Sequence, residues 1–173
     1  MPSAAEYLAA LDAFMAAEKV IQGANLPFRW ADGYSRHEKA AKFPLEYEQE
    51  TQNGVHLLVI AFPNANVLKF RLSLCFHAAL CRLDYTDEFH PNSFRLDGES
   101  VPPSINGPHF HSWAVNKRFF MSGAAAADLK NAVPFESPAR TFDAILRWFC
   151  EETRIAGLGP GHGVELPRRE TLI

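Results

Sequence analysis

Apolar and polar residues alternate over two successive segments in the middle of the chain, VLKFRLSLC at 67–75 and AALCRLDY at 78–85. Successive side chains of a β-strand point to opposite faces of a sheet, so a period of two predicts strands with one apolar and one polar face. In the second segment Arg82 and Asp84 share the polar face. This pattern predicts a domain built around an antiparallel sheet.

Three further segments extend the predicted sheet. LEYEQET at 45–51 and VHLLVIAF at 55–62 flank Asn53-Gly54, a pair that tolerates the positive φ of a type I′ hairpin turn. HFHSWAV at 109–115 resumes a strand pattern. The sequence therefore predicts about five strands arranged as a meander.

We expect one helix before these strands in the sequence and one helix after them. Ser3 and Glu6 form a capping box at the start of the first helix, which we expect to end near Gln22. Ser137 and Pro138 suit the N-cap and the first position of the second helix. Apolar residues recur at helical spacing in both: Leu8, Leu11 and Met15, then Phe142, Ile145, Leu146 and Phe149. The predicted fold class is α+β, with both helices packed against the sheet.

The other segments indicate one domain followed by a tail. We expect a short helix at 36–42, and a loop at 86–108 that is rich in Pro, Asn, Asp, Ser and Gly. Structureless loops of this length are uncommon in compact domains and are often functional or disordered. We assign 1–156 to a single α+β domain and 157–173 to a C-terminal tail, whose glycines are expected to end the second helix.

Composition limits the compartment and the partners. No apolar run approaches the roughly 18–20 residues of a membrane-spanning helix, so we expect no membrane contact. The three cysteines have no CxxC spacing, which predicts free thiols and a cytoplasmic location. A net charge of −3 gives no general attraction to nucleic acid. Such a contact would need a local patch, for example Arg82 with Lys117 and Arg118, unless these are ordinary solvated charges.

Candidate chemistry gathers between Arg82 and His111. His109 and His111 stand at i and i+2 of a predicted strand, so they project to the same face roughly 7 Å apart. Such a pair suits a shared metal ion, a general base beside a general acid, or simple packing on a half-buried face. Asp84 lies on the preceding strand and His90 lies in the long loop. Because no thiolate is near and no third ligand is fixed on a rigid element, we expect no bound metal and no cofactor.

The run CRLDYTDEFHPNSFRLDG…NGPHFHSW at 81–113 resembles an uncharacterised family of small bacterial and phage proteins. The shared features are an R-L-D strand, a loop with H-x-N and D-G, and a P-H-x-H strand. They fall here on Arg82, Leu83, Asp84, His90, Asn92, Asp97, Gly98, Pro108, His109 and His111. The similarity extends from about Leu45 to the end of the last helix. This chain differs in a longer loop before Pro108 and in SWAV after the second histidine. More distantly, the acidic strand followed by a histidine-rich strand is similar to TumE-like toxins of toxin–antitoxin pairs, which are regarded as ribonucleases.

Together the residues and the resemblance imply a small phage- or mobile-element-associated protein that acts as a toxin-like, metal-independent ribonuclease. His109 or His111 would deprotonate a ribose 2′-OH, and the other imidazole or His90 would protonate the leaving 5′-oxygen. Arg82 would stabilise charge on the phosphate, and Asp84 would orient a histidine. The implied partners are RNA or an antitoxin protein.

Two alternatives stay open. A non-enzymatic phage inhibitor or anti-defence protein would bind a host protein through Phe89, Phe94 and Trp113, which we expect to be exposed around the long loop. A metal-dependent hydrolase would use the same histidines as ligands.

Overall fold

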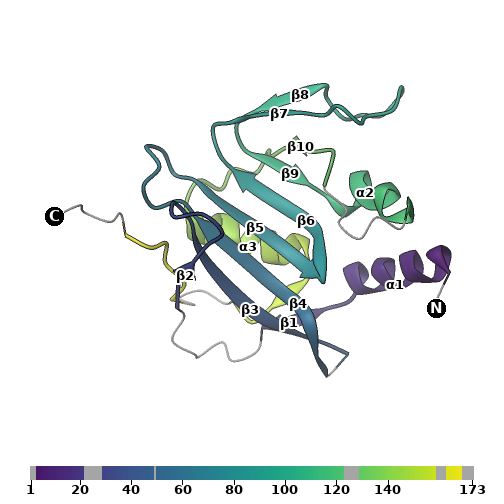
Figure 1. Ribbon diagram of the computed structural model, residues 1–173, viewed down its shortest axis with the longest axis horizontal. Helices are drawn as coiled ribbons and strands as arrows, with labels where there is room; N and C mark the ends of the chain where they lie inside the picture. The colour runs from purple at the N-terminus through teal and green to yellow at the C-terminus, as the bar shows by residue number, and fades with distance from the viewer. Residues whose placement is uncertain (1–2, 22–28, 49, 123–128, 159–162, 169–173) are drawn as a thin grey trace.

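Four long strands form the centre of the sheet and neighbour one another in the order in which they occur in the chain (Figure 1). They are β3 (Lys39–Tyr47), β4 (Glu50–Ala61), β5 (Phe70–Phe76) and β6 (Ala78–Tyr85), and each pairs antiparallel with the next. The computed structural model describes residues 3–21, 29–48, 50–122, 129–158 and 163–168. The long alternating segments of the sequence therefore do form the central antiparallel strands.

Five short strands enlarge this sheet to nine strands rather than the predicted five or so. They are β1 (Lys19–Ile21), β2 (Ala31–Asp32), β9 (His109–His111), β10 (Val133–Pro134) and β11 (Ile155–Ala156). Only the pairing of β1 with β11 is parallel among the described residues. β9 is the start of the strand predicted at 109–115. The other four have two or three residues, too few to show an alternating pattern, and the sequence did not predict them.

The predicted hairpin turn at Asn53-Gly54 is wrong, because both residues lie inside β4. The chain instead reverses at Glu48, which has a φ of 54° and lies between the paired residues Tyr47 and Glu50. Gly54 has a φ of 92°, and a Cβ atom built on it would lie 2.5 Å from Nδ1 of His77. The glycine is therefore required by a close approach to the β5–β6 connection and not by a turn.

The first helix, α1 (Ala4–Ala16), begins with the predicted capping box but ends earlier than expected. Gln22 lies outside the described residues, but the helix has already ended at Ala16, because the backbone of Ala17 is extended and leads into β1. The fully buried Lys19 lies in β1, and its Nζ donates to the carbonyl of Phe14 at 2.8 Å and of Ala17 at 2.7 Å. Burial lowers the pKa of Lys19 to about 8. These bonds satisfy carbonyls at the helix C-terminus that have no partner within the helix.

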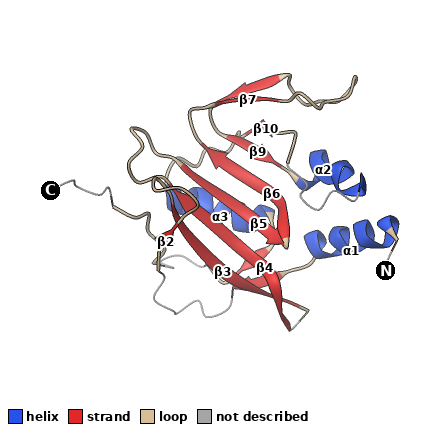
Figure 2. Ribbon diagram, viewed as in Figure 1, coloured by secondary structure: helices blue, strands red, loops and turns tan. Residues whose placement is uncertain are grey.

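The last helix, α3 (Phe142–Glu152), buries the predicted stripe of Phe142, Ile145, Leu146 and Phe149. Its N-cap is Thr141, whose side chain accepts a hydrogen bond from the amide of Ala144, so the expected start at Ser137 and Pro138 is wrong. The Phe142 ring packs edge-on against Phe70 of β5, 5.0 Å between centroids, and α3 lies against one face of the sheet (Figure 2). The other face of β5, which carries Arg71, points away from this helix.

Other connections differ from the prediction. The segment expected as a short helix at 36–42 belongs to β3 from Lys39 onward. The long loop contains a two-stranded arm, β7 (Phe89–Pro91) and β8 (Ser104–Asn106), which extends beyond the sheet in Figure 1. The strand predicted at 109–115 ends at His111 and leads into α2 (Trp113–Asn116) and a 3₁₀ helix, η1 (Lys117–Ser122).

The predicted free cysteines are confirmed, since Cys75, Cys81 and Cys150 are unpaired and buried. After α3, Gly159, Pro160 and Gly161 lie outside the described residues, whereas Val164 is buried in the core. Among the described residues, none of the helices is both long enough and apolar enough to span a bilayer.

The helix stripe predicts a large stability effect. Phe149 is fully buried and packs edge-on against Phe110 of β9, so Phe149→Ala should lower the free energy of unfolding by about 3–5 kcal/mol. Urea denaturation measures this loss. The exposed Phe89 is the matched control, and Phe89→Ala should leave the midpoint nearly unchanged; equal losses in both variants would contradict the assigned core.

The Cys81 thiol predicts an alkaline loss of stability. Burial raises its pKa from 9.0 to about 12, so the unfolded chain releases this proton first and stability falls as the pH rises above 9. The stability advantage of the wild type over Cys81→Ala should shrink by about 1.4 kcal/mol between pH 8 and pH 10. Urea titrations at the two pH values test this, and a constant difference would contradict it.

Candidate functional site

The carboxylate of Asp84 is the centre of a polar cluster on the sheet face that points away from α3. The strand register creates this cluster, because Asp84 of β6 lies opposite Arg71 of β5 on one side and opposite His109 of β9 on the other. Arg82 lies two residues earlier in β6, on the same face, and pairs with His111 of β9.

The contacts of Asp84 are short and come from both sides. Its Oδ1 accepts from Nε of Arg71 at 2.6 Å, and its Oδ2 accepts from Nε of Arg82 at 2.8 Å. The same Oδ2 lies 3.5 Å from Nε2 of His109 and 3.3 Å from Nε2 of His111. Burial opposes the ionisation of this carboxyl, but the positive charges of Arg82 and Arg71 outweigh burial and hold its pKa well below the usual 3.8. Asp84 is therefore a buried anion.

Each of the three imidazoles is oriented by a backbone oxygen. Nδ1 of His109 lies 2.8 Å from the carbonyl of Gly107, and Nδ1 of His111 lies 3.1 Å from the carbonyl of Asn131. His90, from β7, bonds to the backbone of Lys130, and its Nε2 is buried without a hydrogen-bond partner. One ring nitrogen from each imidazole lies within 4.8 Å of those of the other two, so the three residues could hold a metal ion.

The segment that orients two of these imidazoles is itself fixed by two buried asparagines. Asn116 accepts from the amide of Asn131 at 2.9 Å and donates to its carbonyl at 2.8 Å. Asn92 makes the same pair of bonds to Ala132, at 2.7 Å and 2.9 Å. The carbonyl that faces His111 is thus bonded directly by Asn116 of α2, while Asn92 of the arm holds the next residue.

The cluster opens into a cleft of about 180 Å³. Its lining combines cationic, acidic, imidazole and aromatic side chains: Lys69, Arg71, Arg82, Asp84, Glu88, His90, His109, Phe62, Phe70 and Phe89, with Thr86. Lys69 is ion-paired with Glu88 at the entrance, and Phe89 is 61% exposed. His111 is not part of the lining and is 0% exposed, so it lies beneath the cleft. Burial lowers its pKa to about 4, which makes it a neutral imidazole at pH 7.

All five residues predicted from the sequence, Arg82, Asp84, His90, His109 and His111, are brought together. Sequence reasoning missed Arg71 and Lys69. Both lie on the polar face of the strand predicted at 67–75, where they could be expected to neighbour Arg82 on the next strand. Within the asparagine network, Asn92 belongs to the H-x-N pattern, but no sequence pattern pointed to Asn116 or to the segment that both residues hold.

The expectation that Trp113 is exposed is wrong, and of the two alternatives for Lys117 and Arg118 the structure does not favour a basic patch. Trp113 is buried, 9% exposed, and its Nε1 donates to Asp12 at 2.7 Å, so it cannot be an exposed anchor. Lys117 lies 3.6 Å from the other carboxylate oxygen of Asp12, and Arg118 is ion-paired with Glu99. These two cations are therefore matched by carboxylates and do not form a basic patch with Arg82.

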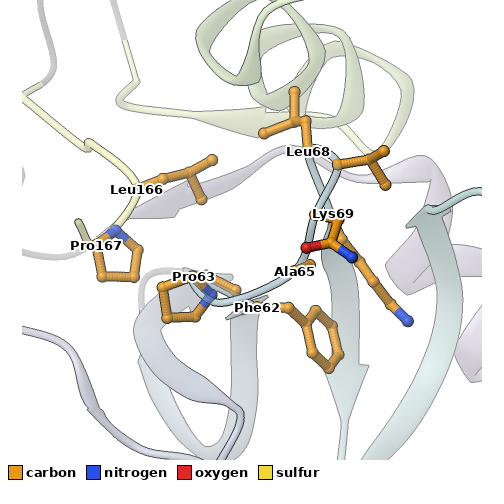
Figure 3. Close-up of a pocket in the computed structure, with 10 residues that line it drawn as sticks. Phe62, Pro63, Ala65, Leu68, Lys69, Leu166 and Pro167 are labelled. Carbon is orange, nitrogen blue, oxygen red and sulfur yellow. The ribbon is translucent and has the colours of Figure 1, made fainter. Parts of the chain in front are cut away.

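A second hollow, of about 260 Å³, lies between the β4–β5 connection and the C-terminal segment (Figure 3). Its lining is mostly apolar and includes Phe62, Pro63, Leu68, Leu166 and Pro167, with Lys69 as its one charged side chain. It contains no imidazole or carboxylate, so the cleft around Asp84 is the better candidate for chemistry.

No protein-family model, curated protein or solved structure matches this chain. The residue-level resemblance described above therefore stays a prediction, and the functional argument depends on the geometry of the cleft.

Asp84 should contribute to stability as well as to the site. Asp84→Asn removes the negative charge that pairs with two partly exposed guanidinium groups. We expect this change to lower the free energy of unfolding by about 2 kcal/mol. Chemical denaturation at pH 7 provides the measurement. The control is Asp32→Asn, because Asp32 pairs with Lys39 at the surface and is 88% exposed, so its loss should change little. If the two variants lose equal stability, the cluster is not a buried network.

Proposed function

We propose that the protein is a toxin-like ribonuclease that cleaves RNA in the cleft around Asp84. The observation that carries this proposal is the lining of the cleft, in which Lys69, Arg71 and Arg82 meet the imidazoles of His90 and His109. Cationic side chains that surround imidazoles suit a phosphodiester, whose cleavage needs charge stabilisation on the phosphate and a proton acceptor beside it.

The phosphate is assigned to the guanidinium side of the cleft. Arg71 and Arg82 both use Nε to bond Asp84, which fixes the planes of the two guanidinium groups. The terminal N–H groups of Arg71, whose side chain is 36% exposed, are then oriented donors for a phosphate oxygen. Such a local site does not require a basic protein, so the net charge of −3 does not exclude it.

The nucleophile is assigned to the imidazole side of the cleft. The ribose 2′-OH of RNA lies next to the phosphodiester that it attacks, so the site has to supply a proton acceptor and not an external nucleophile. His90 and His109 line the cleft, whereas His111 is covered. In this proposal His111 is a positioning residue, and the role expected for it from the sequence passes to the other two imidazoles.

An aromatic ring at the entrance fits the base of a single-stranded substrate. Phe89 precedes His90 in β7, lines the cleft and is 61% exposed. Stacking of a base on an exposed ring stabilises single-stranded RNA binding by about 1–3 kcal/mol, independent of sequence. Single-stranded RNA therefore fits this entrance better than a duplex.

A non-enzymatic binding protein is the second candidate, and one observation favours it. Phe94 and Leu96, in the connection between β7 and β8, are 53% and 59% exposed, and they lie outside the lining of the cleft. Exposed apolar side chains on a projecting arm are typical anchors for a protein partner. The wild type should then bind a protein partner without cleaving RNA, and Phe94→Ala should weaken that binding.

The ribonuclease proposal predicts that Arg71→Gln slows cleavage of a single-stranded RNA by about 10²-fold or more, because one donor to the charged phosphate is lost. Arg36→Gln is the matched control, since Arg36 is exposed in the β2–β3 connection, and it should cleave at the wild-type rate. Gel analysis of purified proteins measures both rates. In a bacterial host, induction of the wild type should arrest growth and Arg71→Gln should relieve the arrest. Absence of RNA cleavage by the wild type, with and without added divalent metal, would overturn the proposal.

A further inference from the structure

We infer that His90, His109 and His111, together with Oδ2 of Asp84, form a binding site for one divalent transition-metal ion of the zinc class. This inference gives the cleft a metal-bound state in which His90 and His109 are ligands and no longer the proton acceptors proposed above, and it does not depend on RNA being the substrate. It departs from the sequence-based expectation of a metal-free site. That expectation assumed that the third ligand lies on a flexible loop, whereas His90 lies in β7, which pairs with β8.

The tautomers of the three imidazoles leave one lone pair on each ring. A carbonyl oxygen only accepts hydrogen bonds, so the ring nitrogen that faces it carries the proton. Nδ1 of His109 faces the Gly107 carbonyl, and Nδ1 of His111 faces the Asn131 carbonyl. His90 bonds to the backbone of Lys130, and since its Nε2 has no partner, this bond uses Nδ1. In the neutral rings all three Nε2 atoms therefore present lone pairs.

These lone pairs face one another and an anion. Nε2 of His109 and of His111 lie 3.5 Å and 3.3 Å from Oδ2 of Asp84, yet neither nitrogen carries a proton to donate when its ring is neutral. The unpartnered Nε2 of His90 belongs to a ring whose centroid is 4.8 Å from that of His109 and 4.7 Å from that of His111. Acceptors gathered in this way repel one another unless a cation lies between them.

Two of the distances between the proposed ligand atoms match those of a tetrahedral site. Zinc bonds imidazole nitrogen and carboxylate oxygen at about 2.0–2.2 Å, which places the ligand atoms of a tetrahedron about 3.3–3.5 Å apart. The two distances from Oδ2 to the imidazole nitrogens, 3.5 Å and 3.3 Å, lie in this range. The backbone carbonyls behind each ring are the partners that metal-bound imidazoles normally have, because they fix the ring and leave the opposite nitrogen free.

The neighbouring guanidinium group currently supplies part of the positive charge. A terminal nitrogen of Arg82 lies 3.1 Å from Nε2 of His111, while Nε of the same residue bonds Oδ2 of Asp84. Because the guanidinium group is planar, metal binding requires the whole group to turn away from His111, and its Nε then leaves Oδ2 of Asp84. The side chain is 26% exposed, so it has room to turn toward solvent. Arg71 bonds the other oxygen of Asp84, Oδ1, so this bond leaves Oδ2 available to the metal ion.

The donor set selects the class of ion. Three neutral imidazoles and one carboxylate suit zinc and the neighbouring divalent ions, whereas calcium and magnesium prefer oxygen ligands alone. His90 and His109 line the cleft, so the ion reaches the site from the same side as a substrate. When bound there, it would polarise a phosphoryl oxygen as a Lewis acid.

The test is metal binding by chelator-treated protein, measured without RNA. We expect one Zn²⁺ per chain by titration calorimetry, a rise in melting temperature, and visible absorption bands of tetrahedral Co²⁺. His90→Ala removes the ligand that is least buried and should weaken Zn²⁺ binding by at least about 100-fold, more than the loss of an outer partner. His37→Ala is the matched control, since His37 is exposed and remote from the cluster, and it should bind as the wild type does.

Stoichiometric binding that His90→Ala abolishes would establish the site. Failure of the wild type to bind Zn²⁺ and Co²⁺, or equal binding by His90→Ala and the wild type, would overturn it. Because RNA cleavage is measured separately, the two proposals can fail independently. If the protein binds metal but does not cleave RNA, the metal site is supported and the ribonuclease proposal is overturned. If it cleaves RNA but binds no metal, the ribonuclease proposal is supported and the metal site is overturned.

Discussion

The ion pairs of the buried Asp84 carboxylate determine the arrangement of the whole cleft. A buried carboxylate is costly unless it is paired and hydrogen-bonded, and here two guanidinium groups meet its two oxygens. The strand register makes this possible, because Arg71 of β5 lies directly across from Asp84 and Arg82 lies two residues away on the same face. Both arginines are thereby held with fixed planes, which a flexible surface cation would not be.

The imidazoles depend on a different part of the chain. His111 is fully buried, and its Nδ1 proton is taken by a carbonyl of a segment about twenty residues later in the sequence. Asn92 from the arm and Asn116 from α2 hold that segment by paired hydrogen bonds. Folding of the arm onto the sheet therefore brings His90 into place and, through Asn92, holds Ala132 beside the carbonyl that faces His111, which Asn116 bonds directly.

The sequence predicted those features that depend on long, regular patterns. Alternation over 67–85 and the stripe of α3 were sufficient for the central strands and the last helix, and the HxH spacing placed His109 and His111 on one face of a strand. It failed where tertiary contacts decide the outcome. Gly54 was interpreted as a turn residue, although a glycine is required there by the close approach of His77. Strands of two or three residues are too short to show a hydrophobic period. Burial of His111 was likewise beyond reach, because it depends on Asn131 and its neighbours.

The same lone pairs explain why an acid–base mechanism and a metal site compete for this cleft. In a catalytic pair of the acid–base kind, a carboxylate normally orients one nitrogen of the imidazole and leaves the other for the substrate. Here backbone carbonyls orient Nδ1, and Asp84 lies on the side of Nε2, where a substrate proton would have to arrive. A proton, a guanidinium nitrogen or a metal ion can each satisfy the acceptors gathered at that point. Only the metal ion serves all three imidazoles at once, because the Arg82 nitrogen bonds a single ring and a proton resides on one nitrogen at a time.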